Sequence, residues 1–250
     1  QIIAAILAQV FNLKCNRELN ISMKGFRPNG HLIVQIYKVG APSIVVQAIG
    51  SLMTYGMNLI LAAFGSAQTV FGIYFKLQSF VFMPVFGLNN GMVPIIAYNY
   101  GAGHKDRVIK TIKHSVAYGV GIMFVGLLAM HIFPAQLMRM FDAEESLIAI
   151  GTPALETISL SFVFAGFCIV VGSVFQALGN GVYSMIVSVA RQMCVLLPVA
   201  KLLSLSGEVT LIWWAFPIAE LASVLLTSYF LVRIYRKVIC HIGEPVVQDA

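Results

Sequence analysis

Charged residues are scarce in this sequence. Only 10% of its 250 residues are charged and 59% are hydrophobic, whereas about a quarter of a soluble domain is charged. No formal charge occurs in the 37 residues between Lys38 and Lys76 or in the 34 residues between Glu156 and Arg191. Because one membrane-spanning helix needs about 20 apolar residues, the composition excludes a soluble globule and predicts a polytopic membrane protein.

Signatures of catalysis and of metal binding are also missing. The sequence contains no HExxH, no GxSxG and no Walker glycine–lysine loop, and its five histidines are scattered. Its four cysteines form no CxxC pair, which favours reduced cysteines that pack within the protein. We therefore expect no enzyme, no cofactor and no metal site, and any pumping must draw on an ion gradient.

The apolar segments predict an all-α integral membrane fold. A truncated span covers about 2–13, and six fuller spans cover about 36–63, 67–99, 112–133, 147–177, 182–203 and 209–235. The domain organisation that follows is the end of a truncated helix (1–13), a loop (14–35), a six-helix unit (36–237) and a tail (238–250). Because Gln1 opens an apolar run without a preceding Met, we expect a fragment of a longer chain.

Basic residues predict the orientation of these spans. Alternate connections hold 12 of the 16 Lys and Arg residues, concentrated in loop 14–35 with Lys38, in segment 104–114 and near the carboxyl end. The opposite connections hold Arg139 and Lys201 beside several acidic residues. Because Lys and Arg are enriched in cytoplasmic loops, we expect a multi-pass protein of the cell membrane with loop 14–35 and the carboxyl terminus in the cytoplasm.

Four ionisable residues fall inside the predicted spans: Lys76, Glu156, Arg191 and Glu220. A charged group in the hydrocarbon region costs several kcal/mol unless it is paired or hydrated. Two interpretations remain open at this point. The four residues are either charge pairs that hold helices in register or parts of an ion pathway.

Polar residues form a stripe on each of two neighbouring spans. The members are spaced by three and four residues, as on one face of a helix: Gln47, Ser51, Thr54 or Tyr55, and Asn58 on the first span, and Gly72, Lys76, Ser79, Met83, Gly87 and Asn90 on the second. Such stripes line a wet cavity or form hydrogen bonds between helices. We favour the cavity because adjacent spans share the pattern, and its aromatic and methionine side chains suit large, flat or cationic organic molecules.

Several motifs resemble one known family. The segment from Gly72 through Lys76 and Pro84 to Pro94 is similar to the eighth helix of MATE multidrug efflux transporters. Further similarity lies in Tyr98-Asn-Tyr-Gly-Ala, Phe175-Gln-Ala-Leu-Gly-Asn-Gly, Arg191-Gln and Ala215-Phe-Pro-Ile-Ala-Glu. Together these motifs resemble the MepA-like branch, over about 36–237 and in the expected order.

The resemblance implies a twelve-helix protein of two six-helix lobes related by a pseudo-twofold axis along the membrane normal. This chain would be the end of helix six, the inter-lobe loop and the carboxyl-terminal lobe. Its partners would be the lipid bilayer, small organic substrates and an amino-terminal lobe, on the same polypeptide or from a second copy.

The resemblance also implies a function. Members of the family export drugs and other organic, mostly cationic, compounds by alternating access in exchange for H⁺ or Na⁺. The candidate substrate cavity then comprises Gln47, Tyr55, Asn58, Lys76, Gln78, Met83 and Asn90, and the candidate coupling network comprises Glu220, Arg191 and Glu156. One departure is that some branches carry a glutamate in the seventh helix, whereas span 36–63 has no acidic residue.

Two other functions stay open. One is a flippase for lipid-linked oligosaccharides in the same superfamily, which favours a more cationic cavity than Lys76 and Arg191 give when Glu156 and Glu220 balance them. The other is a static six-helix scaffold, in which the buried charges pair permanently.

Overall fold

The structure is a computed structural model that describes residues 2–15 and 29–243, and these residues form helices and turns without strands. The chain divides into two units, residues 1–38 and 39–250. The first unit contains α1 (Ile2–Cys15) and the beginning of α2 (Gly30–Leu61). Most of the predicted loop 14–35 and the end of the predicted tail lie outside the described residues.

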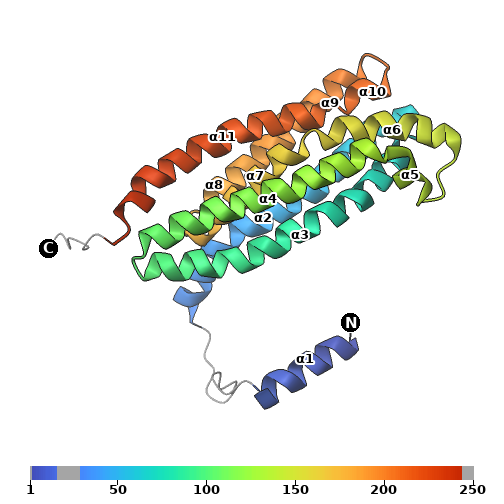
Figure 1. The fold of residues 1–250 in the computed structure, drawn as a ribbon. Coiled ribbons are helices and arrows are strands. Elements are labelled where there is room, and N and C mark those ends of the chain that lie inside the picture. The colour runs from blue at the N-terminus through green and yellow to red at the C-terminus, as the bar shows by residue number, and fades with distance from the viewer. Residues whose placement is uncertain (1, 16–28, 244–250) are drawn as a thin grey trace. The chain divides into compact units, whose positions relative to one another are not determined.

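The second unit is a bundle of long helices that run side by side (Figure 1). After α2 the chain forms η1 (Ala62–Phe64), α3 (Ala67–Gly101), α4 (Lys105–Ile132), α5 (Pro134–Arg139), α6 (Glu145–Ser159) and α7 (Phe162–Ala177). It continues through α8 (Gly181–Val189), η2 (Ala190–Leu196), α9 (Leu197–Ser204), α10 (Val209–Ile212), α11 (Ala215–Lys237) and η3 (Ile239–His241).

The six predicted spans are confirmed. By length and composition, five helical segments of the described chain can cross a membrane, over Gly40–Phe64, Ala67–Gly101, Lys105–Ile132, Gly181–Ser204 and Val209–His241. The sixth span is the bent pair α6 and α7, whose axes differ by 48°. The protein is therefore a multi-pass membrane protein.

The bend between α6 and α7 was not predicted, because apolar residues continue through it. The hydroxyl of Ser159 donates to the carbonyl of Glu156 at 3.0 Å, and that of Ser161 donates to the carbonyl of Ile158 at 2.6 Å. Serine hydroxyls that bond to carbonyls of the preceding turn compete with the helical hydrogen bonds and often bend helices. They also satisfy carbonyls that hydrocarbon would leave unpaired.

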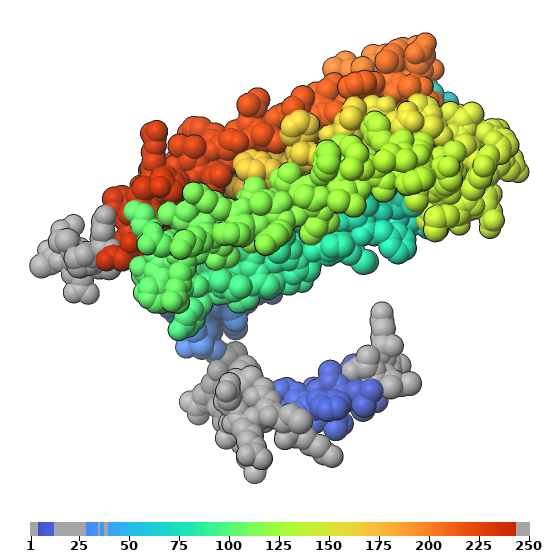
Figure 2. All heavy atoms as spheres, viewed as in Figure 1, coloured from blue at the N-terminus to red at the C-terminus, as the bar shows by residue number. Residues whose placement is uncertain are grey.

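Close helix crossings in the bundle depend on glycine. A Cβ atom on Gly119 of α4 would lie 2.6 Å from Val170 Cγ2 of α7, and one on Gly126 would lie 2.2 Å from Val81 Cγ1 of α3. Small residues let helices in membranes approach closely. Helix α4 therefore packs against both α3 and α7, and part of α7 is visible between α4 and α11 on the molecular surface (Figure 2).

An aromatic cluster joins α3 to the last span. The ring centroid of Phe71 lies 6.4 Å from that of Trp213 and 6.1 Å from that of Phe216. Tyr74 contacts the same Phe216 ring edge-on, at 5.9 Å between centroids. All four side chains are buried, so this part of the aromatic content forms core.

The two basic segments of this unit meet at one end of the bundle. Lys105 Nζ, which follows the α3–α4 turn, donates a hydrogen bond to the carbonyl of Cys240 at 2.8 Å. The same turn approaches the chain after η3, where a Cβ atom on Gly243 would lie 3.0 Å from the Gly103 carbonyl oxygen. The α9–α10 turn lies at the opposite end (Figure 1). Which end faces the cytoplasm stays a prediction.

The glycine crossing can be tested with two alanine substitutions in α4. We expect Gly126→Ala to lower the free energy of unfolding by about 1–3 kcal/mol because its new Cβ must displace the stiff Val81 side chain. Gly121→Ala is the matched control, since a Cβ placed there would meet no other described side chain or helix within 4 Å. Thermal unfolding of the purified variants in detergent measures the difference. Equal transition temperatures for the two variants would contradict the close crossing.

Candidate functional site

A cavity of about 700 Å³ lies within the second unit, between α2, α3, α7, α8, η2 and α11. Ligand pockets typically enclose about 300–1,000 Å³. Its polar lining consists of Gln47, Gln78, Asn89, Asn90, Ser173, Gln176, Ser184, Ser188, Arg191, Gln192, Ser223 and Thr227. Its apolar lining consists of Val46, Gly50, Met53, Phe82, Phe86, Val93, Pro94, Cys168, Ile169, Gly172, Phe175 and Val187.

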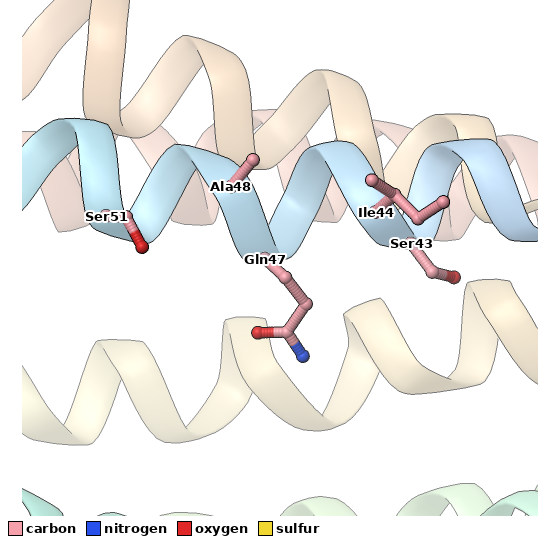
Figure 3. Close-up of a pocket in the computed structure, with 5 residues that line it drawn as sticks. All are labelled: Ser43, Ile44, Gln47, Ala48 and Ser51. Atoms are coloured by element: carbon pink, nitrogen blue, oxygen red, sulfur yellow. The ribbon is translucent and has the colours of Figure 1, made fainter.

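Helix α2 supplies a stripe of small polar residues at the edge of this cavity. Ser43, Gln47 and Ser51 are spaced by four residues and also line an open depression of about 520 Å³ on α2. Figure 3 shows these three side chains on one edge of the helix, while Ile44 and Ala48 project from the other edge. Gln47 belongs to both hollows, so the depression and the cavity share this amide.

Helix α3 contributes an aromatic wall and two asparagines. The rings of Phe82 and Phe86 lie 6.4 Å apart between centroids, and Asn89 and Asn90 follow Phe86 by one turn. The Asn89 side chain is buried, and its Oδ1 atom has no hydrogen-bond partner among the described residues. A buried polar atom without a partner is costly. Asn89 therefore places an unsatisfied acceptor within the wall of the cavity.

An ion pair joins two helices at the far wall. Arg191 Nη1 of η2 donates a hydrogen bond to Glu220 Oε1 of α11. The Arg191 side chain is 25% exposed and lines the cavity, whereas the Glu220 side chain is 8% exposed and does not line it. Glu220 Oε2 has no hydrogen-bond partner in the described part of the chain. The carboxylate is thus half satisfied.

A π-helix carries the arginine. Residues Ala190–Leu196 form it, and the N–H of Leu197 bonds to the carbonyl of Gln192, five residues back. Pro198 follows, which has no N–H to donate and clashes with the carbonyl four residues earlier in a regular α-helix. Such π-helical turns are frequent at functional sites. The inward face of this span is formed by Ser184 and Ser188 before the π-helix, Gln192 and Leu196 within it, and Ala200 after it.

The structure brings together four of the predicted site residues. Gln47, Gln78, Asn90 and Arg191 line the cavity, and Glu220 lies directly behind Arg191. Tyr55 and Met83 are exposed outside its lining. Asn58 forms hydrogen bonds to its neighbours, donating to the Thr54 carbonyl at 2.9 Å, while its own carbonyl accepts from Gln68 Nε2 at 2.8 Å.

Lys76 and Glu156 do not join the ion pair. Lys76 Nζ lies 5.6 Å from the centroid of the Phe141 ring, and Glu156 is half-buried in α6. Within the described part of the chain, the ion pairs closer than 4.0 Å are Arg191–Glu220 and the exposed Arg139–Glu145. Of the four intramembrane charges that could neutralise one another, the structure therefore pairs two, Arg191 and Glu220.

Sequence reasoning missed the polar lining contributed by the last spans. The missed residues are Ser184 and Ser188, which precede the predicted Arg191 in one span, and Ser223 and Thr227, which follow the predicted Glu220 in another. They are spaced by three and four residues, which is the pattern used above for α2 and α3. The same signal could have found them. Asn89 was overlooked beside Asn90. Among the described residues, no three His, Cys, Asp or Glu side chains gather as metal ligands do.

The energetic role of the ion pair can be measured against the exposed pair. We expect Arg191→Leu to lower the free energy of unfolding by about 3 kcal/mol, because it leaves the buried Glu220 without a partner. Arg139→Leu should cost at most about 1 kcal/mol, as is usual for exposed pairs. Denaturation of the purified protein in detergent measures both. Equal losses would show that the Arg191–Glu220 pair contributes no more than a surface pair.

Comparison with known proteins places this chain in a family. The MatE family model matches residues 42–202. The multidrug export protein MepA of Staphylococcus haemolyticus is 25% identical over 236 residues, which cover 94% of this chain and 52% of that protein. MepA of Staphylococcus aureus strain MSSA476 is 27% identical over 219 residues, covering 87% of this chain and 48% of that protein.

Solved structures agree with the fold. The structure of the MATE multidrug transporter DinF-BH is 30% identical, with a TM-score of 0.79 over 94% of this chain and 53% of that one. A MATE crystal structure in the straight conformation superposes with a TM-score of 0.83 at 18% identity, over 94% of this chain and 54% of that one. The chain thus spans about half the length of the relatives that it matches. Because the family model matches residues 42–202, which lie within the six-span unit described above, this chain belongs to the MatE family.

Proposed function

We propose that this chain is the carboxyl-terminal lobe of an exporter of drugs and other organic, mostly cationic, compounds that exchanges them for H⁺ or Na⁺ by alternating access. The observation that carries the proposal is the Arg191–Glu220 pair at the wall of a polar and aromatic cavity inside a bundle of membrane spans. Ionisable residues within spans mark ion and substrate pathways. The MepA and MATE relatives, named as multidrug transporters, support the same function.

Glu220 is the coupling group in this proposal. One of its carboxylate oxygens holds Arg191, and the other has no partner, so a proton or a cation can bind there. Occupation of that oxygen weakens the attraction between α11 and η2. Because an ion shifts a conformational equilibrium only when it binds the two states unequally, the ion pair would link cation binding to the packing of these two helices.

A second six-helix lobe completes the transporter. The relatives are about twice the length of the matched segment, and the polar faces of α2 and α3 include exposed side chains such as Tyr55 and Met83. The second lobe would come from the same polypeptide or from a second copy. The end of the bundle that carries Lys105, Arg233 and Arg236 would face the cytoplasm, as the positive-inside rule requires.

Glutamine substitutions test the coupling role. In the complete protein, Glu220→Gln should abolish or sharply reduce drug efflux at an unchanged membrane level, because the amide keeps the side-chain shape but cannot take up a cation. Glu145→Gln is the control, since Glu145 is exposed and pairs with Arg139. Glu156→Gln tests the other intramembrane acid, and we expect it to retain efflux. Normal efflux by Glu220→Gln would remove Glu220 from coupling.

The identity of the coupling ion follows from vesicles that contain the complete protein. An imposed gradient of either H⁺ or Na⁺ should drive uptake of a fluorescent organic cation, and Glu220→Gln should eliminate the response. A protein that responds to neither gradient would contradict cation coupling.

The need for a second lobe predicts the native mass. Extracted in mild detergent from its own source, the protein should have a mass near twice the 27.2 kDa of this chain, either as one polypeptide or as a dimer. Denaturing electrophoresis distinguishes the two. A native species near 27.2 kDa would contradict the two-lobe proposal and favour a static scaffold.

A further inference from the structure

The charge that faces the cavity is positive. Among the described residues that line the cavity, Arg191 alone has a permanent charge, and none carries a carboxylate. Glu220, which balances Arg191, lies behind it and has a nearly buried side chain. A ligand inside the cavity therefore meets a guanidinium first and reaches the carboxylate only past it.

The guanidinium has hydrogen-bonding capacity to spare. It carries five N–H donors, and in the described part of the chain its hydrogen-bond partner is Glu220, bonded through Nη1. A guanidinium can bind two planar oxygen groups along different edges, and it binds carboxylates bidentately. Ser188 lies one turn before Arg191 on the same side of its span and also lines the cavity. Its hydroxyl adds a second donor to the lining of the cavity.

The remaining lining defines the rest of the ligand. Phe82 and Phe86 offer aromatic surfaces, which bind flat rings by stacking or edge contacts. The cavity volume of about 700 Å³ accommodates a ligand of drug size.

We propose that this cavity is a subsite for aromatic carboxylates, in which Arg191 binds the carboxylate and the phenylalanines hold the ring. The inference rests on the proposed export function only in treating the bound compound as cargo. It extends that function to acids and zwitterions, whose carboxylate end enters this lobe. Glu220 holds one edge of the guanidinium in place. Because its negative charge partly neutralises Arg191, it also limits the affinity of the other edge for an anion.

The test uses two probes of the same shape: hydroxynaphthoate, an aromatic acid, and the uncharged hydroxynaphthamide. Binding to the complete purified protein in detergent is followed by probe fluorescence at neutral pH. We expect the acid to bind at least about tenfold more tightly than the amide, as a charge-assisted hydrogen bond provides. An acid that binds no more tightly than the amide would overturn the proposal.

Variants then assign the preference to Arg191. Arg191→Gln should remove the preference, so that the acid and the amide bind with similar affinity, and Glu220→Gln should increase acid affinity several-fold because the guanidinium loses its competing carboxylate. The double variant Arg191→Gln with Glu220→Gln leaves no unpaired charge, so it keeps the test valid if the single arginine variant does not fold. Arg139→Gln, at the exposed ion pair, is the control and should bind as the unaltered protein does.

The outcomes separate this inference from the export function. A folded double variant that still prefers the acid, or a Glu220→Gln variant with weakened acid binding, would overturn the anion subsite. Drug efflux that depends on Glu220 would leave the export proposal standing in that case. Conversely, an Arg191-dependent preference for the acid in a protein without efflux would support the subsite and contradict the exporter.

Discussion

The backbone of a membrane span must satisfy its own hydrogen bonds, because hydrocarbon offers no water to replace them. This constraint explains why the described chain is helical throughout its spans and why each interruption of a span carries a compensating bond. At the bend between α6 and α7, two serine hydroxyls bond to carbonyls of the preceding turn. In η2, the N–H of Leu197 bonds five residues back instead of four. Irregular backbone is thus confined to places where protein groups supply the missing partners.

The two irregular segments have different relations to the cavity. The π-helix carries Arg191 and lies against the cavity wall, next to α11. The α6–α7 bend lies away from the lining residues and changes the direction of a span before it reaches Cys168 and Ser173. The local geometry of η2 and the charge of Glu220 together set the position of the guanidinium, and so any rearrangement of the π turn would also move the cavity's permanent charge.

Much of the fold was predictable from the sequence, and part of the site was. Apolar runs and the Gly-rich breaks predicted six spans, and their positions agree with the helices. For the site, the spacing on α2 and α3 identified Gln47 and Asn90, the family resemblance added Gln78, and burial in an apolar run identified Arg191 and Glu220 as important charges. The same reasoning grouped Lys76 and Glu156 with them. In the structure, Lys76 lies over an aromatic ring and Glu156 is half-buried elsewhere, because helix rotation and packing decide which polar face meets which neighbour.

The sequence by itself determined that this protein folds in a membrane, how many spans it has and where its intramembrane charges lie along the chain. These properties depend on local composition and on the length of each apolar run. Because the hydrocarbon core has a set thickness, the length of an apolar run indicates whether it can span the membrane as a helix. Only the tertiary structure decided that Arg191 pairs with Glu220, that the arginine faces the cavity and that the carboxylate lies behind it. Which charges pair and which side chains face the cavity depend on the rotation of each helix about its axis and on glycine contacts between helices distant in sequence. The order of residues along the chain specifies neither.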